Sequence, residues 1–414
     1  MELYDNSKKI QKALLVGIDT GEYDAESSMA ELYELVESAG AEPVANMMQK
    51  RDKPDGATAI GSGRLEEIKQ FCEDNEIDFI VFDLELTPTQ IRNIEAATDV
   101  RTIDRTMLIL DIFAIRAKTN EGKLQVELAQ LKYLLPRLSG KGREMSRLGG
   151  GVGTRGPGET KLETDKRHIR RRIESLKDEL SDMKDRRDRH RLRRKKDGII
   201  TAAIVGYTNA GKSTLMNTLT QAGVLSENKL FATLDPTSRA LKLPSGISVM
   251  MIDTVGLVRR LPHHLVEAFK STLEEAATAD IILNVCDASS EEYKLHLDVT
   301  STLLKELGCE GKPVITVYNK CDLVSDPYDL PSDRDSVRIC AKEGFGIDEL
   351  LRKIEENLPV KLRHYHILVP FDKASVIAVL RNAGALRSEE YTADGIIVDA
   401  IVEEPLWHLA EEFK

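Results

Sequence analysis

The sequence predicts an α/β protein built from several domains, and three features of the chain support this class. An apolar run at 199–206 leads through a short loop into a helix that begins near Gly211. Apolar runs also alternate with helical spacing between residues 12 and 98. Leucines and isoleucines between 124 and 183 recur at heptad spacing. Alternating strands and helices favour parallel sheets, and heptads favour paired helices.

The composition is that of a soluble chain. With 414 residues, 41% hydrophobic and 31% charged, the chain is large enough for two to four domains. It has no run of eighteen apolar residues and begins with a polar, mixed segment, so we expect a cytoplasmic protein without a membrane segment or leader. Five scattered cysteines without CxxC spacing predict reduced thiols and no zinc site.

Charge is unevenly distributed along the chain. The net charge of −11 by itself argues against a nucleic-acid binder. Residues 140–197, however, hold 20 Lys and Arg against 11 Asp and Glu, a local charge of +9 that leaves −20 for the rest. A basic segment on an acidic chain is typical of a localised contact with a polyanion.

The N-terminal part is predicted to be a small parallel α/β domain that ends near residue 115. Its GSGR segment at 61–64 opens a helix and is either an anion site or, as is more usual for a lone glycine-rich helix start, a cap or packing turn. The expected strands are 12–17 and 78–83, and the expected helices are 26–38, 63–75 and 88–98.

The next part is predicted to be an antiparallel coiled-coil hairpin. Two series with 4-3-4-3 spacing are joined by a loop, and such series pair most simply with each other. Pro136 lies in the last turn of the first helix, where it predicts a kink or an early stop. The series are Leu124, Leu128, Leu131, Leu135 and Leu138, then Ile169, Ile173, Leu176, Leu180 and Met183.

The loop of the hairpin, at about 140–161, is rich in glycine and basic residues. Its eight glycines cannot bury a core, which predicts a segment that is disordered alone. It is either a basic finger that orders on phosphates or an inert solvated loop. Four cations of this loop are predicted RNA contacts: Lys141, Arg143, Arg147 and Arg155.

The second helix continues into a basic run, RRDRHRLRRKK, where Arg187 and His190 replace apolar residues of the heptad. Such a run is usually a solvated face, yet one that interrupts a coiled-coil seam favours contacts to nucleic-acid phosphates. Few aromatic residues interleave, so shape and phosphate recognition of folded RNA is expected. The predicted contacts are Arg186, Arg187, Arg191, Arg193 and Arg194.

The central motif is GxxxxGKS at 206–213, between a β-branched apolar run and a helix. In this context loop amides and a helix N-terminus face an anion, which predicts a phosphate-binding loop over a plain glycine turn. Lys212 is expected on the β- and γ-phosphates and the Ser213 hydroxyl on Mg²⁺. The predicted nucleotide contacts are Gly206, Tyr207, Thr208, Asn209, Ala210, Gly211, Lys212, Ser213 and Thr214.

Two further segments fit the metal and the terminal phosphate. A DxxG motif ends an apolar run, which places Asp253 near Mg²⁺, usually through water, and the Gly256 amide near a γ-phosphate. In FATLDPT, either Thr233 or Thr237 could close onto Mg²⁺ in the triphosphate state. The predicted contacts are Phe231, Ala232, Thr233, Asp253, Thr254, Val255 and Gly256, with Ser213, Thr233 and Asp253 as metal ligands.

A fourth motif is predicted to select the base. PVITVYNKCD reads as a strand that ends in a carboxylate, Asp322, which can accept hydrogen bonds from the N1–H and amine of guanine. Adenine lacks both donors in that arrangement, so ATP is rejected. Four ordered motifs therefore predict a domain that binds GTP and GDP. Its base-binding residues are Asn319, Lys320, Cys321 and Asp322, then Cys340, Ala341 and Lys342, with cysteine where serine is more usual.

These motifs resemble those of HflX-type GTPases in the Obg-related translation-factor class. The resemblance rests on GYTNAGKS, LFATLDPT, DTVGLVRRLPHHLVEAF and NKCD, and on IGSGRLEEI, DRTMLILDIFAIRAKTNEGKLQVELAQLKYLLPRL and GGVGTRGPGETKLETDKR in the N-terminal half. It covers residues from about 12 to 360. It implies a GTPase that binds the large ribosomal subunit and separates or rescues stalled ribosomes, with the hairpin directed towards rRNA. It also favours Thr233 over Thr237.

Two positions bear on hydrolysis. Leu257 follows DTVG where Ras-like enzymes have a water-positioning glutamine, so we expect slow intrinsic hydrolysis. Asn209 resembles an asparagine that helps to hold K⁺ near the phosphates in related GTPases, in place of an arginine finger's charge. An asparagine in a turn also needs no role beyond a left-handed backbone. The predicted catalytic residues are Lys212, Thr233, Gly256 and Asn209, with Mg²⁺ and K⁺ as cations.

The chain is therefore predicted to have four parts: an N-terminal α/β domain at 1–115, the hairpin at 116–197, a P-loop GTPase domain at 198–358 and a small α+β domain at 359–414. In the last part His364 and His366 alternate on a strand without a Cys or carboxylate cluster, a poor metal site. We expect a monomer. The rival functions are a GTP-gated RNA scaffold and a signalling switch acting on another protein.

Overall fold

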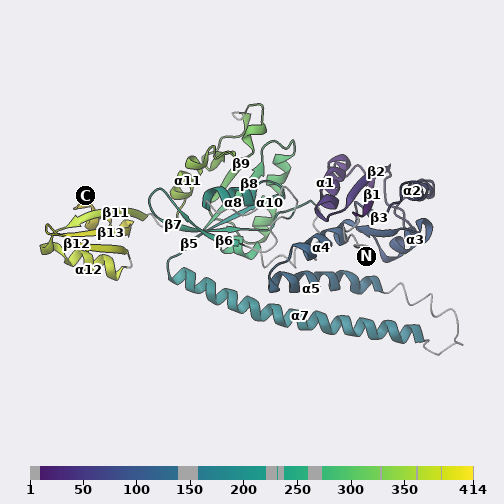
Figure 1. Cartoon of the computed structure of the whole chain (residues 1–414), viewed down its shortest axis with the longest axis horizontal. Helices are drawn as coiled ribbons and strands as arrows, with labels where there is room; N and C mark the ends of the chain where they lie inside the picture. Colours follow the sequence, from purple (N-terminus) through teal and green to yellow (C-terminus); the bar gives the residue numbers. More distant parts are fainter. Residues whose placement is uncertain are drawn as a thin grey trace, which may run out of the picture. The chain divides into compact units, whose positions relative to one another are not determined.

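The structure is a computed structural model. It describes residues 10–138, 157–220, 231, 237–259, 273–326, 329–359, 362–383 and 385–413, with side chains of the long helix from 163. The chain divides into two compact units, of which the first comprises 1–188, 227–235 and 255–271, and the second 189–226, 236–254 and 272–414. The predicted α/β class is confirmed (Figure 1).

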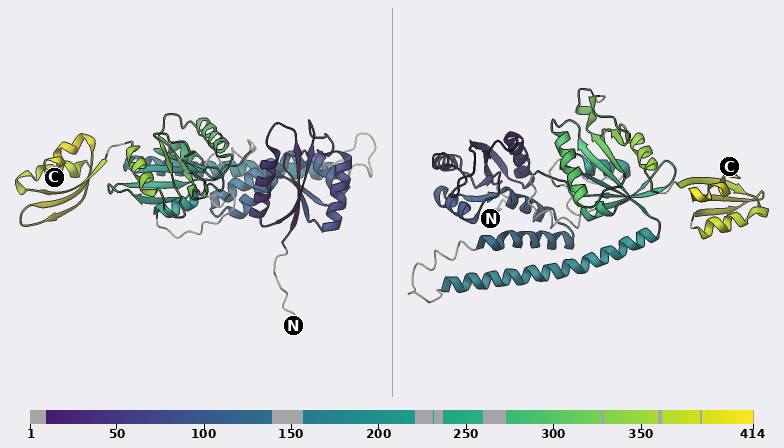
Figure 2. Two further views of the ribbon diagram at one scale, coloured as in Figure 1. Left: turned by 90° about the horizontal axis from the view of Figure 1, so that it is seen from above. Right: turned by 180° about the vertical axis from the view of Figure 1, so that it is seen from behind.

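The N-terminal domain contains a four-stranded parallel sheet in the order β2-β1-β3-β4. Alternate residues of β1 enter two cores: Ala13 and Leu15 pack with α1 and α4, and Leu14 and Val16 with α2 and α3. Helices therefore cover both faces (Figure 2). The elements are β1 Lys12–Asp19, α1 Ala25–Ser38, β2 Glu42–Lys50, α2 Ser62–Asn75, β3 Phe79–Phe82, α3 Pro88–Thr98, β4 Arg101–Asp104 and α4 Arg105–Arg116.

Two of these strands do not stand out in the sequence. Both lie at the edges of the sheet, and β2 has only Pro43 buried, so its sequence lacks the apolar run that marks a central strand. The other edge strand, β4, has four residues. The predicted helices match α1, α2 and α3 to within one residue at their starts. The helix opened by GSGR begins after Gly61, whose amide donates to Gln49 Oε1 at 2.9 Å, in agreement with a packing turn.

The hairpin consists of α5 (Asn120–Arg137) and α7 (Pro157–Lys196). The buried contacts join Leu124 and Leu128 to Ile173 and Leu176, with other residues of both predicted series around them. The two helices lie side by side and run in opposite directions (Figure 1). Pro136 is in the last turn, and α5 ends one residue later. The glycine-rich loop between 139 and 156 lies outside the described residues.

The nucleotide domain is built on a six-stranded sheet in the order β10-β9-β8-β5-β7-β6, in which only β6 is antiparallel to its neighbour. Alternate residues of β5 face α8 and α11 on one side and α10 on the other. Its elements are β5 Ile200–Gly206, α8 Lys212–Thr220, β6 Thr237–Lys242, β7 Ser248–Asp253, β8 Ile281–Asp287, α10 Tyr293–Glu306, β9 Val314–Asn319, β10 Ser336–Arg338 and α11 Ile347–Glu356.

The C-terminal part is an α+β domain with its own core. Its antiparallel sheet has the order β11-β13-β12, and the predicted strand, helix and strand correspond to β11, α12 and β13. The His364 ring on β11 lies close to Gly246 of the nucleotide domain and forms a 2.5 Å contact with Asp399. The elements are β11 Leu362–Val369, α12 Ser375–Asn382, β12 Leu386–Tyr391, β13 Ile396–Glu403 and α13 Trp407–Glu411.

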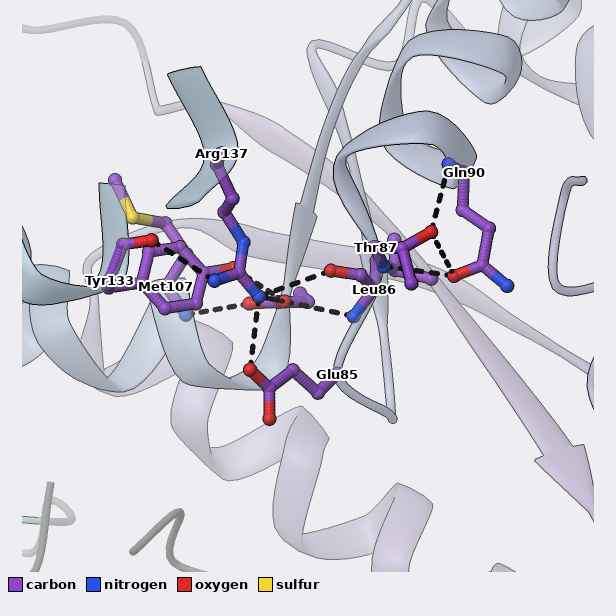
Figure 3. Close-up of polar contacts among 8 residues, drawn as sticks. Glu85, Leu86, Thr87, Gln90, Met107, Tyr133 and Arg137 are labelled. Atoms are coloured by element: carbon purple, nitrogen blue, oxygen red, sulfur yellow. Dashed lines mark hydrogen bonds and ion pairs between the residues drawn. The ribbon is translucent and has the colours of Figure 1, made fainter. Parts of the chain in front are cut away.

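A buried polar cluster joins the N-terminal sheet to the end of α5 (Figure 3). Asp104 is fully buried at the end of β4, where it caps α4 through the Met107 amide at 2.9 Å and accepts the Tyr133 hydroxyl at 2.5 Å. Arg137 lies 3.4 Å over the Tyr133 ring and donates to Glu85 at 3.0 Å. Burial raises the pKa of Asp104, against the effect of these donors. The cluster fixes the last turn of α5.

Candidate functional site

The phosphate-binding loop connects β5 to α8 in a backbone shape that requires glycine at two positions. Gly206 has φ +147°, and a Cβ there would lie 2.0 Å from the Val285 carbonyl oxygen. Gly211 has φ +89°, and a Cβ there would lie 2.2 Å from Asn319 Nδ2. Any larger residue would displace the neighbouring strand or asparagine. The spacing of the motif is therefore a packing requirement.

Lys212 is buried at the start of α8, as a phosphate-binding lysine should be. Its Nζ donates to the Tyr207 carbonyl at 2.7 Å, so the loop itself holds the ammonium group. Burial lowers the pKa of Lys212 to about 8, although the Asp253 carboxylate acts in the opposite direction. A bound phosphate would supply the counter-charge that this buried cation needs.

Ser213 and Asp253 come together as the sequence predicts. The Ser213 hydroxyl donates to Asp253 Oδ2 at 2.9 Å, and Asp253 is buried at the end of β7. A hydroxyl and a carboxylate are hard oxygen donors, the type that Mg²⁺ prefers, so this pair fits the metal. The neighbouring Thr254 is turned away and donates to the Ile204 carbonyl at 2.7 Å, which joins β7 to β5.

Asn319 connects the phosphate loop to the base-binding segment. Its Nδ2 donates to the Ala210 carbonyl at 2.8 Å, and its Oδ1 accepts the Ala341 amide at 3.0 Å. Ala341 is held further by Thr218, whose hydroxyl donates to its carbonyl at 2.6 Å. The Asn319 side chain is buried and bonded at both ends. It therefore holds the phosphate loop at Ala210 and the segment at Ala341 at a fixed distance from each other.

The residues predicted to select the base lie at the ends of β9 and β10. Asp322 is exposed, and its carboxylate lies within 4.8 Å of the Cys340 thiol. Burial, followed by a hydrogen bond to Asp322, raises the pKa of Cys340. Lys320 has a left-handed backbone and pairs with Asp287 at 2.6 Å, while Lys342 is exposed. An exposed carboxylate at this position can accept the N–H groups at the edge of a guanine, as the sequence predicts.

Some predicted site residues lie elsewhere or outside the described residues. Phe231 and Val255 are buried in the core of the N-terminal domain, where the Phe231 ring meets Phe113 edge to face at 4.5 Å. Ala232 and Thr233 lie outside the described residues, so the roles predicted for them and for Gly256 stay predictions. Thr237 is the first residue of β6. Asn209 has φ +59°, the left-handed backbone that a turn asparagine tolerates.

The arginines of the basic run differ in their surroundings. Arg187 pairs with Glu121 at 3.0 Å, and Arg191 and Arg194 pair with Glu275 at 3.0 and 3.4 Å. Arg187 continues the seam towards α5, whereas Arg191 and Arg194 face Glu275 of the nucleotide domain. Arg186 and Arg193 are exposed. The four cations predicted in the loop, Lys141, Arg143, Arg147 and Arg155, lie outside the described residues.

Three contributing residues were not predicted from the sequence. Asp287 ends an apolar strand just as Asp253 does, so its pairing with Lys320 could have been found from that pattern. Glu275 and His296 carry no such signal. Each is a single polar residue on a helix, and only the fold brings Glu275 to the basic run and the His296 ring to Tyr207.

The fold and the site define a P-loop GTPase. Matching family models describe a GTP-binding GTPase N-terminal region at 26–114, a GTP-binding GTPase middle region at 116–194 and a 50S ribosome-binding GTPase at 201–320. No helix within the described ranges is long and apolar enough to cross a membrane. The family models that match the N-terminal half and the nucleotide-binding domain all describe GTPases.

Curated relatives identify the family. GTPase HflX of Lacrimispora saccharolytica is 49% identical over 98% of this chain and 97% of its own length. GTPase HflX of Escherichia coli K12 is 37% identical over 95% and 94%. A GTP-binding protein of Sulfolobus solfataricus, solved with GDP, is 27% identical with a TM-score of 0.47 over 84% of this chain and 98% of that one. The chain belongs to the HflX family of GTPases, and it hydrolyses GTP to GDP and phosphate.

Proposed function

We propose that this GTPase binds the large ribosomal subunit and its rRNA in the cytoplasm, and that it dissociates or rescues stalled ribosomes. GTP controls association, and hydrolysis releases the protein. The observation that carries the proposal is a basic helical hairpin in the same chain as a GTPase domain whose family model is described as ribosome-binding. A local charge of +9 on an otherwise acidic chain suits a contact with an RNA backbone.

Sedimentation with whole ribosomes tests this proposal. Protein with GTP or a non-hydrolysable analogue should move with the large subunit and convert whole ribosomes into subunits, whereas protein with GDP should remain at the top of the gradient. Cosedimentation without any loss of whole ribosomes would leave the scaffold function in place of splitting. Splitting by the analogue alone would show that bound GTP is sufficient.

The basic run offers a matched test of the RNA contact. The pair R186A/R193A removes two exposed charges, and R191A/R194A removes two that pair with Glu275. If Arg186 and Arg193 contact phosphates, the first variant should lower the slope of log affinity against log salt by about 1.4–1.8 and leave the Tm unchanged. The second should lower the Tm.

A signalling switch acting on another protein is the second candidate. It is favoured by the carboxylate partners of Arg187, Arg191 and Arg194, which give much of the basic run a purpose inside the protein. In that case R186A/R193A should leave ribosome association and its salt dependence at the level of the unmodified protein. The same pair of variants therefore separates the two candidates.

Magnesium and potassium dependence belong to the same proposal. The Ser213–Asp253 pair supports Mg²⁺, which would neutralise charge on the β- and γ-phosphates. Removing Mg²⁺ with EDTA should abolish turnover, and Asp253→Asn should raise the Mg²⁺ concentration needed for half-maximal rate. If K⁺ binds near Asn209, turnover should be faster in KCl than in NaCl at equal ionic strength. Equal rates would contradict a catalytic role for K⁺.

A further inference from the structure

The second residue of the phosphate loop, Tyr207, controls the position of the lysine anchor. Its carbonyl is the acceptor for Lys212 Nζ at 2.7 Å. Its side chain is 5% exposed, so the ring is packed inside the protein and is not a contact for solvent. Any rotation of this peptide would move the acceptor and with it the ammonium that meets the phosphates.

The partner of the Tyr207 ring is His296 on α10. The two rings are stacked, with centroids 3.9 Å apart and planes 13° from parallel. α10 packs on β5 through Leu304, which lies against Ala203 and Val205, and within the helix Thr300 donates to the His296 carbonyl at 2.8 Å. The tyrosine ring therefore packs against an imidazole that is carried by a helix packed on the sheet.

We infer that His296 is a positioning residue for nucleotide binding: by stacking on Tyr207 it fixes the loop peptide whose carbonyl anchors Lys212. Aromatic pairs in such a geometry contribute beyond the area they bury. The Tyr207 carbonyl also accepts the Ala210 amide at 3.4 Å, so the stack acts together with a hydrogen bond inside the loop. His296 does not touch the reacting atoms, and its effect is on binding of GDP and GTP alike.

Three variants test the inference: H296A removes the stack, H296F keeps a flat ring, and L295A changes an exposed neighbour on the same helix. H296A should raise the Kd for both GDP and GTP about 3- to 10-fold. Its KM should rise with kcat nearly unchanged, since uniform binding is lost. H296F should lie within about twofold of the unmodified protein, and so should L295A.

A double-mutant cycle keeps the test decisive if H296A is less stable. Tm is measured for every variant, and Kd is taken where each is fully folded. Tyr207→Leu and His296→Leu should each weaken GDP binding, while the double variant should be no weaker than Tyr207→Leu alone, because the stack can be lost only once. Additive losses, or equal Kd values for H296A and L295A, would overturn the inference.

Discussion

If Lys212 binds the phosphates as predicted, its lowered pKa should couple nucleotide binding to the uptake of a proton. Its pKa is lowered to about 8 from an ordinary value of 10.5, whereas bound phosphates favour the charged form. Without nucleotide, stability contributed by this group therefore rises as pH goes from about 8 to 10.5, because the unfolded chain holds the proton in that window. Nucleotide affinity should change in the opposite direction and fall by up to about tenfold per pH unit above 8.

Calorimetry in buffers of different ionisation enthalpy measures the proton directly. At pH 8.5, GDP binding should take up most of one proton, and at pH 7, where Lys212 is already charged, uptake should be close to zero. The pH 7 measurement is the internal control. Equal uptake at both pH values would show that Lys212 carries the same charge in the free and bound protein.

Asn319→Ala is expected to weaken GTP and GDP binding together. The substitution leaves the Ala210 carbonyl and the Ala341 amide without their buried partner, a loss of about 1–3 kcal/mol or roughly 5- to 150-fold in affinity. Titration with a fluorescent guanine nucleotide measures the Kd. Asn93→Ala is the control, because Asn93 lies in the N-terminal domain and donates to the Ala57 carbonyl there. A Kd within twofold of the control contradicts the bridging role.

At the residue scale the sequence predicts chemistry better than packing. The sequence placed the motif glycines at positions that only glycine fits, and it placed Ser213 and Asp253 in contact. Their roles on phosphate and Mg²⁺, and that of Lys212, stay predictions. The burial of Phe231 in the core of the N-terminal domain could not be predicted from the sequence, because the FATLDPT motif indicates only that Phe231 precedes Thr233. The contact of His296 with Tyr207 could not be predicted either, because stacking between two residues far apart in the sequence produces no periodic pattern.

At the scale of elements, α5 is held at its far end by the Asp104 cluster. Tyr133→Phe removes a single hydroxyl, which donates to the buried Asp104 at 2.5 Å. Because the Leu86 and Met107 amides still serve the carboxylate, we expect a loss of about 1–2 kcal/mol in the free energy of unfolding. Tyr33→Phe, on the exposed face of α1, is the matched control in urea titrations. Equal midpoints for the two would contradict the anchor.

Elements with a strong period were predicted, and those without one were not. The heptads of α5 and α7 mark their helices because every seam position is apolar up to Met183. Beyond it Arg187 takes the seam position and pairs with Glu121 of α5, while Arg191 and Arg194 pair with Glu275 of the nucleotide domain. No periodic pattern in the sequence indicates these carboxylate partners. The edge strand β2 was missed because half-exposed strands need no apolar run.

For the whole molecule, the C-terminal domain should be dispensable for nucleotide binding. It has its own core, and its contact with the nucleotide domain runs through Ile401 and the His364 ring beside Gly246, away from the phosphate loop. Truncation after Leu358 should therefore leave the Kd for GDP within about twofold. A small decrease in Tm is expected from exposing that contact. A large loss of affinity would show that this domain shapes the site.

Phe231 lies two residues before Thr233, which is predicted to close onto Mg²⁺, and its ring is buried in the core that contains α4. Its ring belongs to the same core as Phe113 of α4, so moving it is a partial unfolding of that core. If Thr233 closes onto magnesium two residues later, amides of α4 should exchange with deuterium faster with a GTP analogue than with GDP. Phe231→Ala should abolish this difference. The rate of amide exchange in α4 would then show which nucleotide is bound, and the Phe231 side chain would be the cause.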